Sequence, residues 1–122
     1  MCECGNAQWH PNYLVLMADG LVAQDLITTI KEHHRGAHVF LAETMDDALA
    51  AIRDVKFLVV AFVSARPSEF SGSALAEAIR ARNGRVMLLG VEAERKGPSA
   101  EWDVLYQPFS TESVVAQLQN VA

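Results

Sequence analysis

Apolar runs alternate with helical patterns along almost the whole of this 122-residue chain. Five short runs, rich in β-branched and aliphatic residues, are typical of buried strands, and they span residues 13–17, 38–41, 57–63, 86–89 and 104–106. The run 57–63 is the most continuously apolar, so we expect the central strand there. Strands that alternate with helices form a parallel sheet covered on both faces. The alternation therefore predicts a single α/β domain.

Helical spacing of apolar residues separates these runs. Helices are expected between residues 22 and 30, between 45 and 52, from about 73 to 83, and after Ser110. Thr44, followed by Asp47 three residues later, resembles a capping box that starts the second helix, and Gly84 is expected to stop the third. Where a fourth helix would lie, segment 92–100 is short and contains a Gly-Pro pair, so we expect a loop or a single turn there.

The chain is expected to hold one domain at residues 13–122, preceded by a tail at residues 1–12. Hydrophobic residues make up 51% and charged residues 20%, which is typical of a globular protein. The longest wholly apolar run, residues 57–63, is far shorter than the roughly 20 residues that cross a membrane. The first residues lack the basic start and apolar stretch of a secretory signal, so we expect a cytoplasmic protein without membrane contact.

The net charge of −5 argues against a nucleic-acid partner, because the Lys and Arg residues form no long basic block. Arg80, Arg82 and Arg85 come nearest to a basic patch. Glu77 lies one turn earlier, and cations are favoured at the C-terminal end of a helix. We therefore interpret the three arginines as the solvated face and the end of the third helix.

Two cysteines in the tail, Cys2 and Cys4, lie near His10 in the sequence, but a structural zinc site needs four suitably spaced ligands and a second pair is missing. The tail is interpreted instead as flexible and reduced, or as packed by Trp9. An active site is not evident either, since no His stands at a strand end with a nucleophile and no paired carboxylates converge. We expect no metal, no cofactor and no enzymatic activity.

Ligands of open parallel sheets bind at the carboxyl ends of the strands. The residues there are Ala18-Asp19-Gly20 after the first strand, Ser64-Ala65-Arg66-Pro67 after the third, Gly90-Val91-Glu92 after the fourth and Gln107-Pro108-Phe109 after the fifth. The first of these segments lacks the Gly-x-Gly-x-x-Gly that dinucleotide binding requires. Dinucleotide binding is therefore not expected.

Two of the segments carry a resemblance to a known family. Leu14-Val15-Leu16-Met17-Ala18-Asp19 resembles the first strand and acidic pair of a bacterial response-regulator receiver domain, the CheY-like family, and Tyr106-Gln107-Pro108-Phe109 resembles its terminal Lys-Pro-Phe. The resemblance covers residues 13–122. It implies a flavodoxin-like three-layer sandwich whose five parallel strands lie in the order 2-1-3-4-5, here with the fourth helix shortened or missing.

In that family two carboxylates after the first strand bind Mg²⁺, a carboxylate after the third accepts phosphate, and a hydroxyl and a lysine contact the phosphoryl group. The matching residues here are Ala18, Asp19, Ala61, Gly90 and Gln107, of which only Asp19 keeps its chemistry. No Asp or Glu occurs from residue 56 to 68, so a shifted alignment supplies no acceptor. The aromatic residue of the family's switch is matched by Val104. The resemblance therefore implies a degenerate receiver, or pseudo-receiver.

Two functions are consistent with such a pocket. The first is a phosphorylation-independent protein-interaction module of bacterial two-component signalling, which binds another signalling protein or a second copy of itself. The family's usual contact region, the last strand and helix, holds Trp102, Tyr106 and Phe109. Some of these aromatics could instead fill the edge of the core. The alternative is a small-ligand or anion sensor in which Ser64, Arg66 and Gln107 line the altered pocket and Arg66 contacts the anion.

Overall fold

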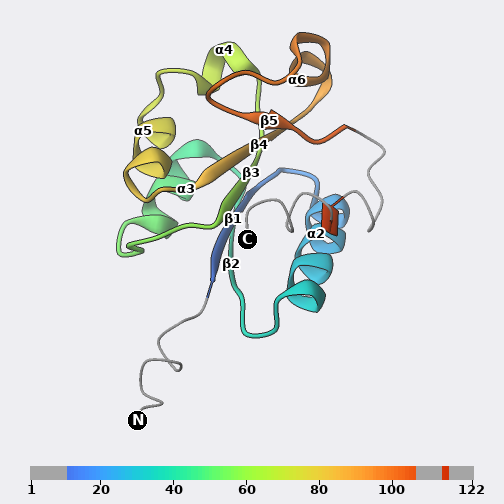
Figure 1. The fold of residues 1–122 in the computed structure, drawn as a ribbon, viewed down its shortest axis with the longest axis vertical. Coiled ribbons are helices and arrows are strands. Elements are labelled where there is room, and N and C mark those ends of the chain that lie inside the picture. Colours follow the sequence, from blue (N-terminus) through green and yellow to red (C-terminus); the bar gives the residue numbers. More distant parts are fainter. Residues whose placement is uncertain (1–10, 107–113, 116–122) are drawn as a thin grey trace.

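The computed structural model describes residues 11–106 and 114–115. Within them, five parallel strands form a sheet in the order β2-β1-β3-β4-β5, which confirms the predicted topology. The strands are β1 (Asn12–Leu16), β2 (His38–Ala42), β3 (Val60–Ser64), β4 (Arg85–Leu89) and β5 (Asp103–Val104). Figure 1 shows the sheet running through the middle of the domain, with helices on either side.

Helices on both faces of the sheet complete three layers. α2 (Gly20–His33) covers one face, and α3 (Met45–Ile52) and α5 (Ala74–Ala81) cover the other (Figure 1). Two short helices, α4 (Pro67–Phe70) and α6 (Val91–Lys96), follow the carboxyl ends of β3 and β4. No helix of the described residues is long and apolar enough to cross a membrane.

The core consists of two apolar clusters, one on each face of the sheet. Alternate residues of a strand point to opposite faces, so Leu14 packs in the cluster under α3 and α5 while Val15 packs in the cluster under α2. β3 is buried on both faces, as predicted for the central strand, and Phe62 is fully buried. Val114 is also fully buried in the α2-side cluster, as predicted for the last helix, whose other residues mostly lie outside the described part.

Polar side chains determine where the helices begin. Thr44 caps α3 as predicted, and its Oγ1 accepts a hydrogen bond from the Asp47 N–H at 3.1 Å. Ser73 caps α5 in the same way through the Ala76 N–H. Such a hydroxyl satisfies an N–H group that has no partner within the helix.

The predicted stop after α5 at Gly84 involves two residues. Asn83 adopts a left-handed conformation with φ 59°, and the Gly84 N–H then donates to the Ile79 carbonyl at 3.0 Å. A Cβ on Gly84 would lie 2.9 Å from Cγ2 of Ile79 and 3.0 Å from Cβ of Leu58. Gly84 is thus required by close packing, while Asn83 supplies the positive φ.

The first and third strands begin at other residues than predicted. β3 starts at Val60, because Phe57 is 65% exposed and its carbonyl accepts a hydrogen bond from the Asn12 side chain. Asn12 belongs to β1, pairing with His38, and not to the tail. The apolar run 57–63 is therefore partly an approach segment, and the strand itself extends to Ser64.

The region between β4 and β5 forms more regular structure than predicted. A loop or single turn was expected at residues 92–100, but α6 spans six residues and is anchored by Ala93, which is fully buried. The helix ends at Gly97, whose φ of 80° no longer continues it. The fourth helix of the sandwich is thus shortened, in agreement with the expected fold. The short helix α4, which starts with Pro67, was not predicted.

The three arginines interpreted as a solvated helix face have different roles. Arg82 is half-buried, and its guanidinium donates hydrogen bonds to four backbone carbonyls, those of Ile52, Arg53, Val55 and Ala78. Arg85 pairs with Asp103 at 2.6 Å, which ties β4 to β5. Arg80 has the largely exposed side chain on α5 that was predicted. Arg82 is at the end of α5 as predicted but is not solvated, and the interpretation is wrong for Arg85, which lies in β4.

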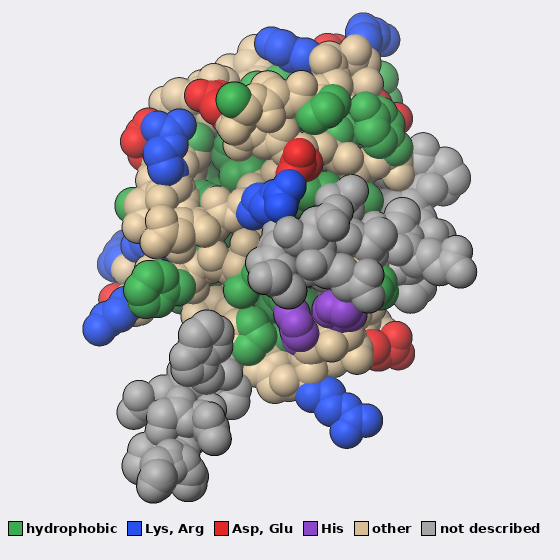
Figure 2. Space-filling view, viewed as in Figure 1, with side chains coloured by type: hydrophobic (Ala, Val, Ile, Leu, Met, Phe, Trp, Pro, Cys, Tyr) green, Lys and Arg blue, Asp and Glu red, His purple; other side chains and the backbone are tan. Residues whose placement is uncertain are grey.

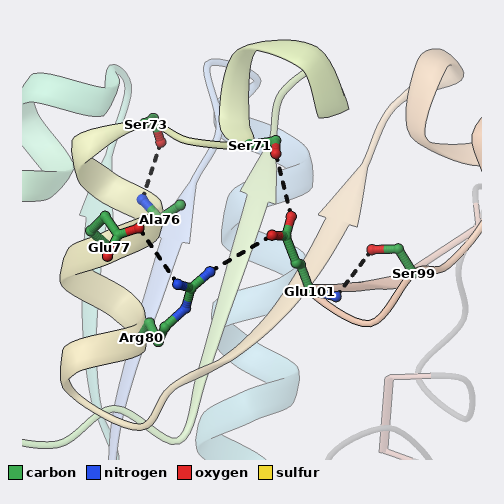
Figure 3. Close-up of polar contacts among 7 residues, drawn as sticks. All are labelled: Ser71, Ser73, Ala76, Glu77, Arg80, Ser99 and Glu101. Atoms are coloured by element: carbon green, nitrogen blue, oxygen red, sulfur yellow. Dashed lines mark hydrogen bonds and ion pairs between the residues drawn. The ribbon is translucent and has the colours of Figure 1, made fainter.

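Arg80 takes part in a polar network that holds the segment before β5 (Figure 3). Its guanidinium lies 3.5 Å from Glu77 and 3.7 Å from Glu101. The Ser71 hydroxyl donates to Glu101, and the Glu101 N–H donates to Ser99 Oγ at 3.1 Å. The network joins α5 and the α4–α5 turn to the loop after α6.

A buried phenol joins β1 to the end of α2. The Tyr13 side chain is fully buried, and its hydroxyl hydrogen bonds to Nδ1 of His34, the C-cap of α2. Burial raises the pKa of Tyr13 to about 12. Burial, and then the neighbouring His33, lower the pKa of His34 below its usual value. Both side chains are therefore uncharged at neutral pH.

Candidate functional site

The carboxyl end of β1 leads into the one acidic residue that matches the receiver pocket. Asp19 is exposed and caps α2, and its Oδ1 accepts hydrogen bonds from the N–H groups of Leu21 at 3.1 Å and Val22 at 3.3 Å. A cap of this kind stabilises a helix by about 0.5–2 kcal/mol. Ala18, also exposed, offers no metal ligand. Asp19 thus has a structural use that accounts for its presence.

The residue at the carboxyl end of β3 is Ser64 and not Ala61. Ala61 is the second residue of the strand, fully buried and paired with Leu14 and Val86, so its predicted place at the strand end is wrong. Ser64 is the last residue, exposed and paired with Leu89. The prediction failed because an apolar run does not indicate at which residue the hydrogen-bonded pairing with the neighbouring strands begins and ends.

Ser64 opens into a small hollow with two acidic walls. The hollow measures about 250 Å³, and its lining is Leu16, Glu43, Thr44, Met45, Ser64, Ala65 and Glu69. No histidine lines it, and among the described residues neither glutamate hydrogen bonds to the Ser64 hydroxyl, while Glu69 is paired with Arg66, so no base is positioned against that hydroxyl. Glu43 and Glu69 were not among the predicted site residues. Glu43 directly follows the second apolar run and was open to prediction, whereas Glu69 lies on the unpredicted helix α4.

Arg66 faces a different hollow from Ser64. Its guanidinium pairs with Glu69 at 3.3 Å, and both side chains are largely exposed. The second hollow, of about 310 Å³ between α4 and α6, is lined by Arg66, Pro67, Ser68, Glu92, Arg95 and Lys96. Figure 2 shows basic side chains at this end of the molecule. Ser64 and Arg66 were expected to line a single crevice. They line two separate hollows, and residues of α4 contribute to the wall of each.

The backbone at Gly90 excludes a side chain. Gly90 caps α6 with φ 124° and ψ 165°, a region that is essentially accessible only to glycine. A Cβ placed there would meet nothing within 4 Å, so conformation and not space is the obstacle. At the position that matches the family's hydroxyl residue, the backbone conformation of this chain thus requires glycine. Gln107, which matches the lysine, lies outside the described residues.

The predicted contact surface is only partly exposed. Trp102 is 6% exposed, packs in the α3-side cluster, and donates its Nε1–H to the Gly97 carbonyl at 3.4 Å, so its assignment to the surface is wrong. Val104, the switch counterpart, is buried in the same cluster. Tyr106 is 52% exposed. Phe109 lies outside the described residues.

Neither a protein-family model nor a curated protein sequence matches the chain. Solved structures do resemble it. The chemotaxis protein CheY4 of Vibrio cholerae is 19% identical, with a TM-score of 0.69 over 93% of this chain and 100% of that one. A response regulator receiver domain protein of Bacillus halodurans is 12% identical, with a TM-score of 0.69 over 93% and 98%. An adenylate cyclase of Rhodopirellula baltica is 17% identical, with a TM-score of 0.67 over 93% and 87%.

These similarities define the class of fold. The chain has the CheY-like receiver fold, as the sequence resemblance implied. Identities of 12–19% carry the fold and not the activity, and one of the three similar proteins is described as an enzyme. Function therefore has to be inferred from the residues at the strand ends.

Proposed function

We propose that this chain is a receiver-like protein-interaction module of bacterial two-component signalling that acts without phosphorylation. The observation that carries the proposal is the end of β3, where an exposed serine with no base hydrogen-bonded to its hydroxyl stands in place of an acceptor carboxylate. Transfer of a phosphoryl group to a serine hydroxyl requires a base that removes its proton. Glu43 and Glu69 line the hollow, but among the described residues neither hydrogen bonds to the Ser64 hydroxyl, and Glu69 is paired with Arg66.

Magnesium binding is disfavoured at the same edge. Mg²⁺ is held in proteins through one or two carboxylates plus the phosphate oxygens of a substrate. Asp19 commits one carboxylate oxygen to two N–H groups of α2, and Ala18 beside it has no ligand atom. Without the metal, the charge that develops during phosphoryl transfer has no counterion at β1.

Exposed apolar side chains support a role in binding another protein. Leu21 is 83% exposed, Val91 71% and Tyr106 52%, and each follows the carboxyl end of a different strand. Exposed apolar residues that follow the carboxyl ends of the strands favour a protein partner over a solvated ion. The module is thus proposed to present its surface constitutively, with no catalytic step.

A phosphate mimic tests the proposal. We expect Mg²⁺ with beryllofluoride to leave the amide NMR spectrum unchanged around Asp19, Ser64 and Gly90, because β3 ends in a serine and Asp19 is engaged as the cap of α2. A receiver with an acceptor aspartate, treated in parallel, shows that the reagent is active. Shifts around Asp19 and Ser64 that disappear in Asp19→Asn would contradict phosphorylation independence.

A second candidate function, the sensing of a small anion, is favoured by the hollow between α4 and α6. Arg66, Arg95 and Lys96 line it with a single acid, Glu92, although the whole chain is acidic. Guanidinium groups bind phosphate and carboxylate through paired donors. This moves the predicted anion contact of Arg66 away from Ser64.

Thermal unfolding in the presence of inorganic phosphate and nucleotides tests the sensor. If the hollow binds an anion, the unfolding temperature rises with ligand concentration, because the ligand binds only the folded state. The rise should be lost in Arg95→Ala and retained in Arg80→Ala, which removes an exposed arginine on α5. An equal response of both variants, or none with any anion, rejects the sensor.

A further inference from the structure

The two edges of the sheet are protected to very different degrees. β5 has only two residues, and its Asp103 is paired with Arg85 at 2.6 Å. Short, charged edge strands are a common means of preventing unwanted strand pairing. β2, at the other edge, has five residues in unbroken register with β1 and contains no Lys, no Pro and no bulge. The edge at β2 therefore remains able to accept another strand.

The backbone groups of β2 alternate between the sheet and its outer side. The His38 N–H donates to the Pro11 carbonyl at 2.9 Å, and the Ala42 carbonyl accepts from the Met17 N–H at 3.0 Å, so both residues face β1. Because successive residues of a strand present their backbone groups to opposite sides, Val39 and Leu41 direct theirs outward. Among the described residues, no strand lies on that side.

The side chains of β2 leave apolar surface beside these outward groups. Leu41 is 52% exposed. Val39 is half-buried against the α2-side cluster, and Phe40 is half-buried against the α3-side cluster. An added strand would cover Leu41 on one face of the sheet and the free edge of Phe40 on the other.

We propose that β2 pairs antiparallel with β2 of a second copy of this chain, about a two-fold axis at Phe40. Val39 then lies opposite Leu41 of the second copy, and Leu41 opposite its Val39. These are the residues whose N–H and C=O groups point outward, so all of these groups are used. The two sheets join into one continuous sheet.

The pattern of β2 favours a second copy over an unrelated strand because it is self-complementary. The two-fold arrangement requires the same patch on both copies, and here it places apolar Val39 and Leu41 side by side and Phe40 against itself. At the ends, His38 lies opposite Ala42, and Glu43 lies opposite Ala37. No like charges meet, although the chain as a whole is acidic.

This inference stands apart from the proposed function. β2 is the edge opposite β5, and none of its residues belongs to the strand-end pocket or to the predicted contact region of Tyr106. A response to beryllofluoride would overturn the proposed function without affecting the dimer, and a monomeric protein would do the reverse.

Sedimentation velocity of the full chain over a concentration series tests the dimer. We expect a concentration-dependent dimer that is lost in Leu41→Lys, which places a charge on the edge, and in Val39→Pro, which removes an outward N–H while leaving the bonds to β1. Proline is tolerated on an edge strand when the missing N–H faces outward. Phe57→Lys is the matched control, since it adds the same charge at a more exposed apolar residue that precedes β3 and has no part in the proposed binding surface.

Amide hydrogen exchange identifies the interface directly. Protection of the Val39 and Leu41 amides should increase with protein concentration, while that of the Asp103 amide on the other edge should not. The exchange result decides the case even if one substitution prevents folding, which circular dichroism reports. A protein that stays monomeric up to millimolar concentration, or a dimer that survives both edge variants or is lost in Phe57→Lys, would overturn the inference.

Discussion

Replacing Arg82 with methionine is expected to lower the free energy of unfolding by about 2–4 kcal/mol. Its guanidinium donates to the carbonyls of Ile52, the last residue of α3, and of Arg53 and Val55 just after it, and to that of Ala78 on α5. Those distances are 2.8–3.1 Å, and no acidic partner shares the charge in these bonds. Methionine retains the apolar stem and removes only the donors.

The effect is large because the carbonyls at a helix C-terminus have no partners within the helix. Arg82 satisfies them from a residue some thirty positions later in the chain, and so fastens α3 to α5 on the same face of the sheet. The cost stays below the sum of four full charged hydrogen bonds, because Arg82 is half-buried and water can replace part of the bonding.

Urea denaturation followed by circular dichroism measures the loss, with Arg80→Met as the matched control. Arg80 is 63% exposed and pairs only with surface carboxylates, an arrangement that contributes about 0–1 kcal/mol. A loss in Arg82→Met that is no greater than in Arg80→Met would show that the carbonyl contacts contribute little.

Replacing Gly90 with threonine is expected to destabilise the fold by about 1–3 kcal/mol. The substitution supplies the hydroxyl that a receiver carries at this position, but φ 124° and ψ 165° force the backbone of any larger residue into strain. Either the strain is retained, or the start of α6 shifts. The same urea experiment measures the cost.

Gly20→Ala is the control for a glycine without conformational demands. Gly20 is the first residue of α2 and has no positive φ, and a Cβ at this position would meet no atom within 4 Å. Alanine there should be neutral or stabilise the protein by up to about 1 kcal/mol. If Gly90→Thr proves as harmless as Gly20→Ala, the glycine at position 90 is not required by the main chain.

The order of strands and helices could be predicted because the buried face of each element requires apolar residues at a regular spacing along the sequence. Runs that are apolar at every residue become strands buried on both faces, as β3 shows, and stripes at helical spacing become α2, α3 and α5. The cap of α3 could also be predicted from the sequence, because Thr44 accepts its hydrogen bond from the N–H of a residue only three positions later. Short elements such as α4 carry too few residues to show a period.

The candidate site was harder to predict because it is assembled from several strand ends. The loss of acidic residues between 56 and 68 is a property of the sequence, but the residue that occupies the strand end is decided by the pairing of β3 with β1 and β4. That pairing selects Ser64 instead of Ala61. It also brings Glu43, which follows β2, to the same hollow.

By itself, then, the sequence determined the class of fold and the lack of any Asp or Glu from residue 56 to 68, because both are visible in residue type and local spacing. Only the tertiary structure decided how individual side chains are used. Arg82 serves carbonyls far away in the chain, Trp102 fills the core, and Gly90 holds a backbone conformation that its neighbours do not reveal. Each of these depends on contacts between distant segments, whose distances a linear pattern does not contain.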